Sequence, residues 1–174
     1  LKLVSPHGIK QFTSDSDEQF DLSGMVFHRG MILVVADKEW NRHIYRVEDK
    51  GDTFTCSPFI TLCPDSDIDF EGIDHGEGKF YITEENRSDV YEVKNNSCKM
   101  MKLEIPWNKS GINRSDWGNR GLEGVAMDTG NNVLFLAKER EPRNIFRIDL
   151  KSMEITEPFR EQLALMAGND ITDL

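Results

Sequence analysis

The sequence lacks an excess of basic residues. Its 174 residues include 21 Lys and Arg against 31 Asp and Glu, so the formal net charge is −10 at pH 7. Nucleic acids and anionic membranes are bound through basic surfaces, and the acidic balance argues against both as partners. No apolar run approaches the roughly 20 residues of a membrane-spanning helix, and no signal peptide is recognisable. A cation-binding or simply solvated surface fits this composition.

Familiar catalytic and metal-binding motifs are also scarce. The four histidines show no ligand spacing, and no G-x-S-x-G motif occurs. The three cysteines, Cys56, Cys63 and Cys98, form no C-x-x-C pair, and their odd number leaves at least one thiol outside any intramolecular bridge. We expect buried free thiols. The alternative is a Cys56–Cys63 bridge, which requires that Ser57-Pro58 turn the segment back.

Helical periodicity is nearly absent, because no apolar stripe at i, i+3 and i+4 persists outside a short stretch at 159–167. Residues 43–47 and 144–148 instead alternate with a period of two and are rich in β-branched and aromatic side chains. The runs Ile32–Ala36 and Val133–Ala137 are apolar throughout, as expected of strands buried on both faces. The sequence therefore predicts an all-β fold.

One pattern occurs three times in the chain. The copies are DLSGMVFHRGMILVVADKEWNRHIYRVE at 21–48, DFEGIDHGEGKFYITEENRSDVYEVK at 69–94 and GLEGVAMDTGNNVLFLAKEREPRNIFRIDL at 121–150. A fourth copy begins with DITDL at 170–174. The starts at 21, 69, 121 and 170 lie about 50 residues apart, and a strand-only repeat of that length is typical of β-propeller blades.

The repeat predicts one partial β-propeller domain over residues 1–174, with about three and a half blades. Closed propellers have about four to eight blades. We therefore interpret the chain as a portion of a longer propeller whose remaining blades, or another chain, pair with its open edges. The alternative is a small protein with an open array of sheets. Inner strands are expected near 23–28, 71–75 and 123–128, and residues 1–12 are expected to complete a neighbouring blade as an outer strand.

A surface loop at 107–120, WNKSGINRSDWGNR, interrupts the step from the second repeat to the third. Its Asn, Ser and Gly content is typical of a solvated turn, but its two tryptophans, Trp107 and Trp117, are not. They either pin the loop to the body of the protein or form a stacking surface, and we favour pinning.

Carboxylates supply the candidate chemistry. Glu71 and Glu123 stand at the starts of first strands, whereas Glu84, Glu85, Glu139 and Asp37 stand at the ends of second strands. Antiparallel pairing brings all of them to one face of the propeller, around its central channel. Crowded carboxylates repel one another unless a cation compensates them, and hard oxygen ligands suit Ca²⁺ or Mg²⁺. We expect Glu71 and Glu123 to be the metal ligands, with Asp37, Glu84, Glu85 and Glu139 as secondary candidates.

A structural role for the same acids is the alternative. Each glutamate could accept backbone N–H groups of the adjacent blade, and Lys38, Lys138, Arg120 and Arg140 could neutralise the remaining charge. Ser23 occupies the position of Glu71 and Glu123 in the first repeat, and we interpret it as a turn or backbone-bonding serine.

The sequence resembles the SdiA-regulated, phytase-like esterase group of bacterial six-bladed propellers. The motifs that carry the resemblance span 21–174 and are DLSG at 21–24, DFEGI at 69–73, GLEGV at 121–125, AKER at 137–140 and DITDL at 170–174. The resemblance implies a six-bladed, extracytoplasmic (periplasmic or secreted) ring with channel-facing acids that hold Ca²⁺. Ser23 and Thr172 replace Glu in two of the four repeats, which would bias a metal shell toward Glu71 and Glu123.

Two classes of function follow. The first is a propeller that binds a small-molecule or protein ligand and carries a Ca²⁺ site at its acidic channel face. The second is a Ca²⁺-dependent hydrolase of esters, lactones or phosphoesters, in which the metal polarises a substrate oxygen and a carboxylate acts as the base. Arg120, Arg140 and Lys138 are the candidates for binding an anionic group of the substrate.

Overall fold

Three sheets, antiparallel except for the pairing of the short first strand, make up the described part of the chain, one for each of the first three repeats. The computed structural model describes residues 11–13, 21–37, 42–51, 53–65, 68–115, 117, 120–140 and 143–165. The strand orders are β1-β5-β4-β3-β2, β6-β7-β8-β9 and β10-β11-β12-β13. The first sheet consists of β1 (Gln11–Thr13), β2 (Asp21–His28), β3 (Met31–Asp37), β4 (His43–Asp49) and β5 (Thr53–Thr61). The second consists of β6 (Phe70–Gly76), β7 (Lys79–Glu84), β8 (Asp89–Lys94) and β9 (Met100–Lys102). The third consists of β10 (Leu122–Asp128), β11 (Val133–Lys138), β12 (Asn144–Asp149) and β13 (Ile155–Thr156).

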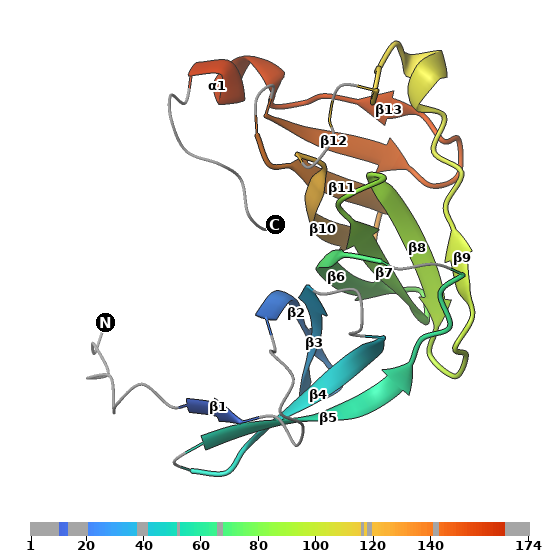
Figure 1. Ribbon diagram of the computed structural model, residues 1–174. Helices are drawn as coiled ribbons and strands as arrows, with labels where there is room; N and C mark the ends of the chain where they lie inside the picture. The colour runs from blue at the N-terminus through green and yellow to red at the C-terminus, as the bar shows by residue number, and fades with distance from the viewer. Residues whose placement is uncertain are drawn as a thin grey trace.

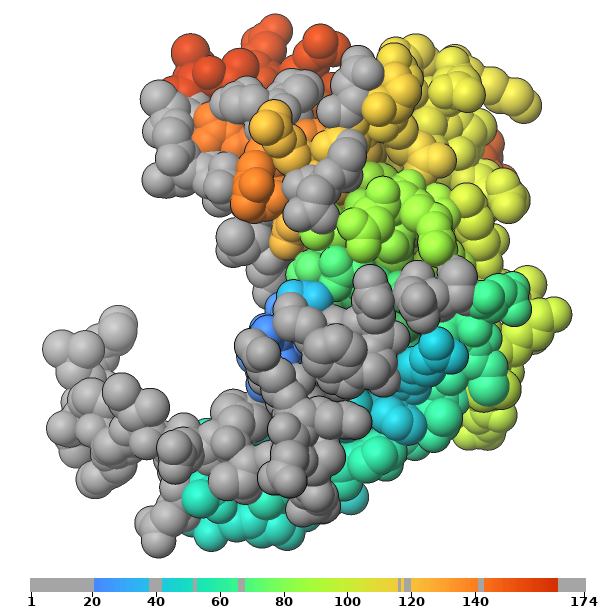
Figure 2. Space-filling view, in the orientation of Figure 1, coloured from blue at the N-terminus to red at the C-terminus, as the bar shows by residue number. Residues whose placement is uncertain are grey.

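The sheets are arranged as blades of a propeller around an arc. Figure 1 shows β2, β6 and β10 on the inner side of this arc and β5, β9 and β13 on its outer side. The coloured atoms of Figure 2 follow the same arc. The fold is all-β, and the expected inner strands at 23–28, 71–75 and 123–128 are confirmed as strands β2, β6 and β10. The chain forms a partial β-propeller, which further blades complete.

In the described part of the chain, two short helices accompany the strands: the 3₁₀ helix η1 (Trp107–Ser110) and α1 (Arg160–Leu165). The helix α1 confirms the helical interpretation of 159–167 over most of that stretch. No helix among the described residues has the length and apolar character needed to cross a membrane. The predicted fourth repeat at 170–174 lies outside the described residues.

Strand β1 differs from the sequence interpretation. Gln11–Thr13 pairs in parallel with Thr53–Thr55 of β5, at the outer edge of the first sheet. The prediction that this segment completes a neighbouring blade is therefore wrong for Gln11–Thr13, and residues 1–10 lie outside the described part. The outer edge of β5 offers unpaired backbone groups, and β1 satisfies some of them.

The tryptophans of the 107–120 loop are buried and belong to the core of the third blade. The Trp107 and Trp117 rings pack edge to face with their centroids 5.6 Å apart. Trp117 also stacks on Phe146 of β12, with ring centroids 5.6 Å apart. The prediction that the tryptophans pin the loop is confirmed. The other residues of η1, which follow Trp107, are exposed.

Glycines let neighbouring inner strands come into backbone contact. A Cβ atom on Gly24 would lie 2.6 Å from the Glu71 carbonyl oxygen of the next blade. A Cβ atom on Gly72 would lie 2.8 Å from the equivalent carbonyl oxygen of Glu123. Such distances are shorter than real carbon–oxygen contacts, so only glycine fits at this position of the repeat. The Gly of the repeated motif is therefore a packing requirement between blades.

The free face of the first blade is apolar. Leu22 and Met25 of β2 are 37% and 63% exposed, and with Ile32, Val34, Val47 and Phe54 they line a hollow of about 350 Å³. The equivalent residues of the second blade, Phe70 and Ile73, are buried against the first blade at 0% and 4% exposure. The same surface is thus covered in one repeat and open in the other. Because a neighbouring blade covers this surface in the second repeat, a further blade is the expected cover for the apolar face of the first.

Substitution of Met25 tests whether a blade covers this face. In the protein that carries all its blades, Met25→Ala should lower the free energy of unfolding by about 2–4 kcal/mol, because the side chain would be buried. In the 174-residue chain, the same change should cost less than about 0.5 kcal/mol. Urea denaturation of both proteins measures the difference. Ile73→Ala is the control, since it should be destabilising in both, and equally small Met25 effects in both would contradict the interpretation.

Candidate functional site

Each inner strand carries a β-bulge at the third residue of the repeated motif. The strand register shifts between Leu22 and Gly24 in β2, between Phe70 and Ile73 in β6 and between Leu122 and Gly124 in β10. The bulged positions include Ser23, Glu71 and Glu123. Since a bulge bends the strand and redirects its side chain, it sets the direction of these residues independently of the alternation along the strand.

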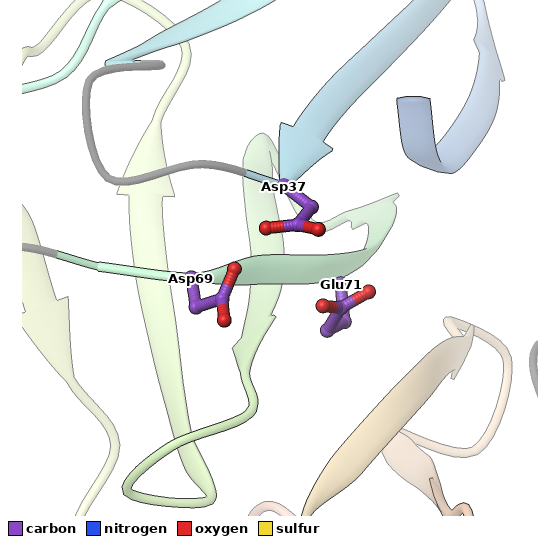
Figure 3. A group of neighbouring side chains, drawn as sticks. All are labelled: Asp37, Asp69 and Glu71. Atoms are coloured by element: carbon purple, nitrogen blue, oxygen red, sulfur yellow. The ribbon is translucent and has the colours of Figure 1, made fainter. Parts of the chain in front are cut away.

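Three carboxylates from two blades meet beside the first bulged glutamate. Asp37 ends β3, Asp69 immediately precedes β6, and Glu71 lies on β6 (Figure 3). Each offers one carboxylate oxygen, and these oxygens all lie within 4.8 Å of one another. We call this set the first acid group. All three side chains are half-buried.

A second acid group repeats this arrangement one blade further on. It consists of Glu85, Glu123 and Glu139, whose oxygens also lie within 4.8 Å of one another. Glu85 follows β7 as Asp37 ends β3, and Glu123 occupies the position of Glu71 in its own repeat. Two members of each group are therefore related by the repeat, whereas the third members, Asp69 and Glu139, occupy different positions in it. Glu71 and Glu123 therefore lie in two neighbouring groups, although both were predicted as ligands of the metal site.

The second group contains an unpartnered buried oxygen. Glu139 is only 7% exposed, and its Oε1 accepts a hydrogen bond from Arg140 Nε at 2.7 Å. Its Oε2 is buried and accepts no hydrogen bond. Among the described residues, no backbone N–H or side chain donates a hydrogen bond to the carboxylates of Glu71, Glu85 or Glu123. The alternative in which these acids accept backbone N–H groups of the adjacent blade has no support at these positions.

Burial and repulsion by neighbouring carboxylates raise the pKa values of Glu71, Glu85 and Glu123. Burial raises the pKa of Glu71 to about 8, with further contributions from the charges of Glu123, Asp69 and Asp37. The pKa of Glu123 is also raised to about 8, first by burial and then by the charges of Glu139 and Glu85, while Arg140 opposes the shift. Burial likewise raises the pKa of Glu85. The two groups thus influence each other, and ionisation of Glu71 and Glu123 is unfavourable near neutral pH.

The other predicted residues lie elsewhere. Glu84 belongs to neither group: its Oε2 accepts the backbone N–H of Arg87 at 2.8 Å, in the turn after β7. Lys138 is buried and donates from Nζ to the Arg140 carbonyl at 2.6 Å, with Nζ 5.6 Å from the centre of the Trp117 ring. Arg140 pairs with Glu139, and Arg120 is exposed. Lys38 lies outside the described residues.

Ser23 takes the structural role expected of it. Its Oγ accepts the backbone N–H of Asp37 at 3.1 Å, which ties the start of β2 to the end of β3. The interpretation of Ser23 as a backbone-bonding serine is confirmed.

Asp69 is the group member that sequence reasoning missed. It opens the second repeat, and its carbonyl accepts the Glu85 N–H at 3.1 Å beside the acid groups. The Asp at the start of both DLSG and DFEGI was the available signal. The third repeat has Gly121 at this position.

The raised pKa values predict that the metal-free protein loses stability as the pH rises from about 6 to 8. Glu71 and Glu123 keep their protons to about pH 8 in the folded state but lose them near 4.5 in the unfolded chain. The folded state therefore binds more protons in this window, and the free energy of unfolding falls as pH increases. Glu71→Gln and Glu123→Gln should each flatten this dependence in thermal melts with a chelator. The exposed Glu104→Gln should not, and a melting temperature that rises across the window would contradict the assignment.

Solved structures of low sequence identity are similar to this chain in fold. The extracellular domain of a protein assigned as the hybrid two-component system BT4673 from B. thetaiotaomicron is 12% identical, with a TM-score of 0.51 over 82% of this chain and 17% of that one. A virginiamycin B lyase from Staphylococcus aureus, in complex with quinupristin, is 18% identical, with a TM-score of 0.48 over 78% of this chain and 40% of that one. The chain thus spans less than half the length of either protein. No curated protein matches it.

The family comparison covers nearly the whole chain. A family model described as SdiA-regulated matches residues 14–174, which include all three described blades and both acid groups. This match confirms the resemblance to the SdiA-regulated family that the repeated motifs indicated. The chain therefore belongs to the SdiA-regulated family.

Proposed function

We propose that this chain is part of a ligand- or protein-binding propeller whose acidic channel face holds Ca²⁺. Glu85, Glu123 and Glu139 are the proposed primary ligands, and Asp37, Asp69 and Glu71 form a second, weaker site. The observation that carries the proposal is the buried, unpartnered Oε2 of Glu139 beside two other carboxylates. A buried carboxylate oxygen without a donor is costly, and a cation would compensate it.

The spacing of the acids fits a calcium ion. Ca²⁺ binds oxygens at about 2.3–2.6 Å, so two ligands on opposite sides of the ion lie about 4.6–5.2 Å apart. The three oxygens of each group lie within 4.8 Å of one another and can share one such shell. Mg²⁺ requires a smaller, near-octahedral shell with oxygens at about 2.0–2.1 Å. A set of buried and half-buried carboxylates from two blades suits the more adaptable calcium shell.

The same geometry leaves room for a ligand. Ca²⁺ takes about six to eight oxygens, and three carboxylates supply only some of them. The remaining positions suit water or the carboxylate, phosphate or carbonyl oxygens of a ligand. The proposal includes an extracytoplasmic location. Extracellular calcium-binding modules bind calcium weakly, with a Kd of about 0.1–1 mM, and a site with few protein ligands suits that range.

A calcium titration tests the proposal. Calcium binds only the folded state, so a concentration about 100-fold above the Kd should raise the free energy of unfolding by about 2.7 kcal/mol. Denaturation of the full-length protein in calcium and in chelator measures this difference. Glu123→Gln and Glu139→Gln should each abolish most of it, whereas Glu71→Gln should reduce it less.

Glu84→Gln is the matched control for the calcium titration. Glu84 is buried, adjacent in sequence to Glu85 and outside both acid groups, and glutamine can still accept the Arg87 N–H. Its calcium response should equal that of the unmodified protein. Stability that is indifferent to calcium and chelator would end the proposal.

A calcium-dependent hydrolase is the second candidate function, and the raised pKa values favour it. Carboxyl groups with a pKa of about 8, as at Glu71 and Glu123, are suited to proton transfer near neutral pH. Bound calcium would supply polarisation of an ester or phosphoester oxygen. Against this candidate, Lys138 and Arg140 already bond to groups of the protein. Of the three basic residues considered for a substrate anion, all of them in the described part of the chain, this leaves the exposed Arg120.

Assays with p-nitrophenyl acetate, an aryl lactone and p-nitrophenyl phosphate separate the two functions. The binding proposal predicts no turnover above buffer, with or without calcium. Calcium-dependent turnover that Glu123→Gln abolishes and Glu84→Gln preserves would instead establish the hydrolase. The comparison of these two variants guards against a contaminating enzyme, which neither substitution would affect.

A further inference from the structure

Two exposed thiols meet at the outer rim, between the first and second blades. Cys63 follows the end of β5 by two residues, and Cys98 precedes the start of β9 by two residues. Both are exposed and free. The Cys63 N–H donates to the Cys98 carbonyl at 2.8 Å, and Cys63 forms a parallel bridge with Lys99. In Figure 1 the chain that leaves β5 runs alongside β9.

This pairing places the two cysteines within the reach of a disulfide bond. Cys98 directly precedes Lys99, the residue that is bridged to Cys63, so it lies one residue along the chain from the position opposite Cys63. Bridged strands lie about 4.8 Å apart, and a disulfide requires Cα atoms about 4.4–6.8 Å apart. The Cys98 side chain also lies close enough to the Cys63 thiol to raise its pKa. The sequence offered no sign of this pair, because the two residues belong to different repeats.

We propose that Cys63 and Cys98 are a redox modification site, at which a reversible disulfide joins the outer edges of the first two blades. The oxidant is a small-molecule disulfide. One cysteine thiolate attacks it, forms a mixed disulfide and releases one reagent thiol. The second cysteine thiolate then attacks the protein sulfur of the mixed disulfide and releases the second reagent thiol. The protein loses two protons and two electrons, and the reagent disulfide is reduced to two thiols.

The third cysteine, Cys56, does not compete for formation of this disulfide. Cys56 is buried in the first sheet beside Val34, Ala36 and Tyr45. Burial raises the pKa of its thiol to about 11, which leaves almost no thiolate near neutral pH. Hydrogen bonding with Cys98 and desolvation also raise the pKa of Cys63. Formation of the bond should therefore accelerate as the pH increases from 7 to 9.

The bond would act on the interface between the blades. Residues 63 and 98 enclose the inner, second and third strands of the second blade, β6, β7 and β8. Closing this loop in the unfolded chain removes conformational entropy from that state, so oxidation should stabilise the folded protein. The oxidised protein should melt about 4–12 °C above the reduced protein.

Oxidation of the full-length protein with glutathione disulfide at pH 8 tests the proposal. A Cys56→Ala background leaves one cysteine in each of the tryptic peptides 51–79 and 95–99. Mass spectrometry should find these two peptides joined, and a reductant should separate them. Oxidation should raise the melting temperature, and Cys98→Ser in the same background should remove both the link and the shift. Glutathione on both cysteines without a link, or a link without a change in melting temperature, would overturn the proposal.

Discussion

Backbone contact between neighbouring inner strands is the constraint on which the rest of this structure depends. Gly24 and Gly72 leave no space for a Cβ atom against the carbonyl oxygens of the next blade. Thr83 joins this contact: its Oγ1 accepts the Gly72 N–H at 2.7 Å and lies 3.5 Å from the Glu123 carbonyl oxygen. Because this hydroxyl is fully buried, its contacts with these two backbone groups fix the register between the second and third blades.

The same contact explains why acids gather at the channel face. The bulged residue precedes the glycine in each inner strand, so blades packed closely at the glycine also bring their acids together. Glu123 therefore meets Glu85 of the preceding blade, and Glu71 meets Asp37. Such crowding opposes folding, because burial and like charge both disfavour the ionised carboxylates. Stability given up at one place without structural compensation is typical of a functional site.

Local patterns predicted the fold well and the site only in part. Alternation and repeat length predicted the three inner strands, because strand formation and blade stacking follow from residue types close in sequence. The membership of Asp37, Glu71, Glu85, Glu123 and Glu139 in one acidic face was also predictable from antiparallel pairing. The division into two groups was not. It depends on the bulges and on the angle between blades, which no residue type encodes by itself.

The sequence by itself determined the blade repeat, its inner strands and the burial of Trp107 and Trp117, because hydrophobic period and aromatic content act locally. The tertiary structure decided which distant groups meet. In the folded chain, Lys138 and Glu84 bond to backbone groups outside the two acid groups, and Asp69 belongs to the first acid group. It also placed Cys63 beside Cys98 across a blade boundary. These contacts arise from packing between blades, where the position of a side chain depends on the neighbouring repeat as much as on its own.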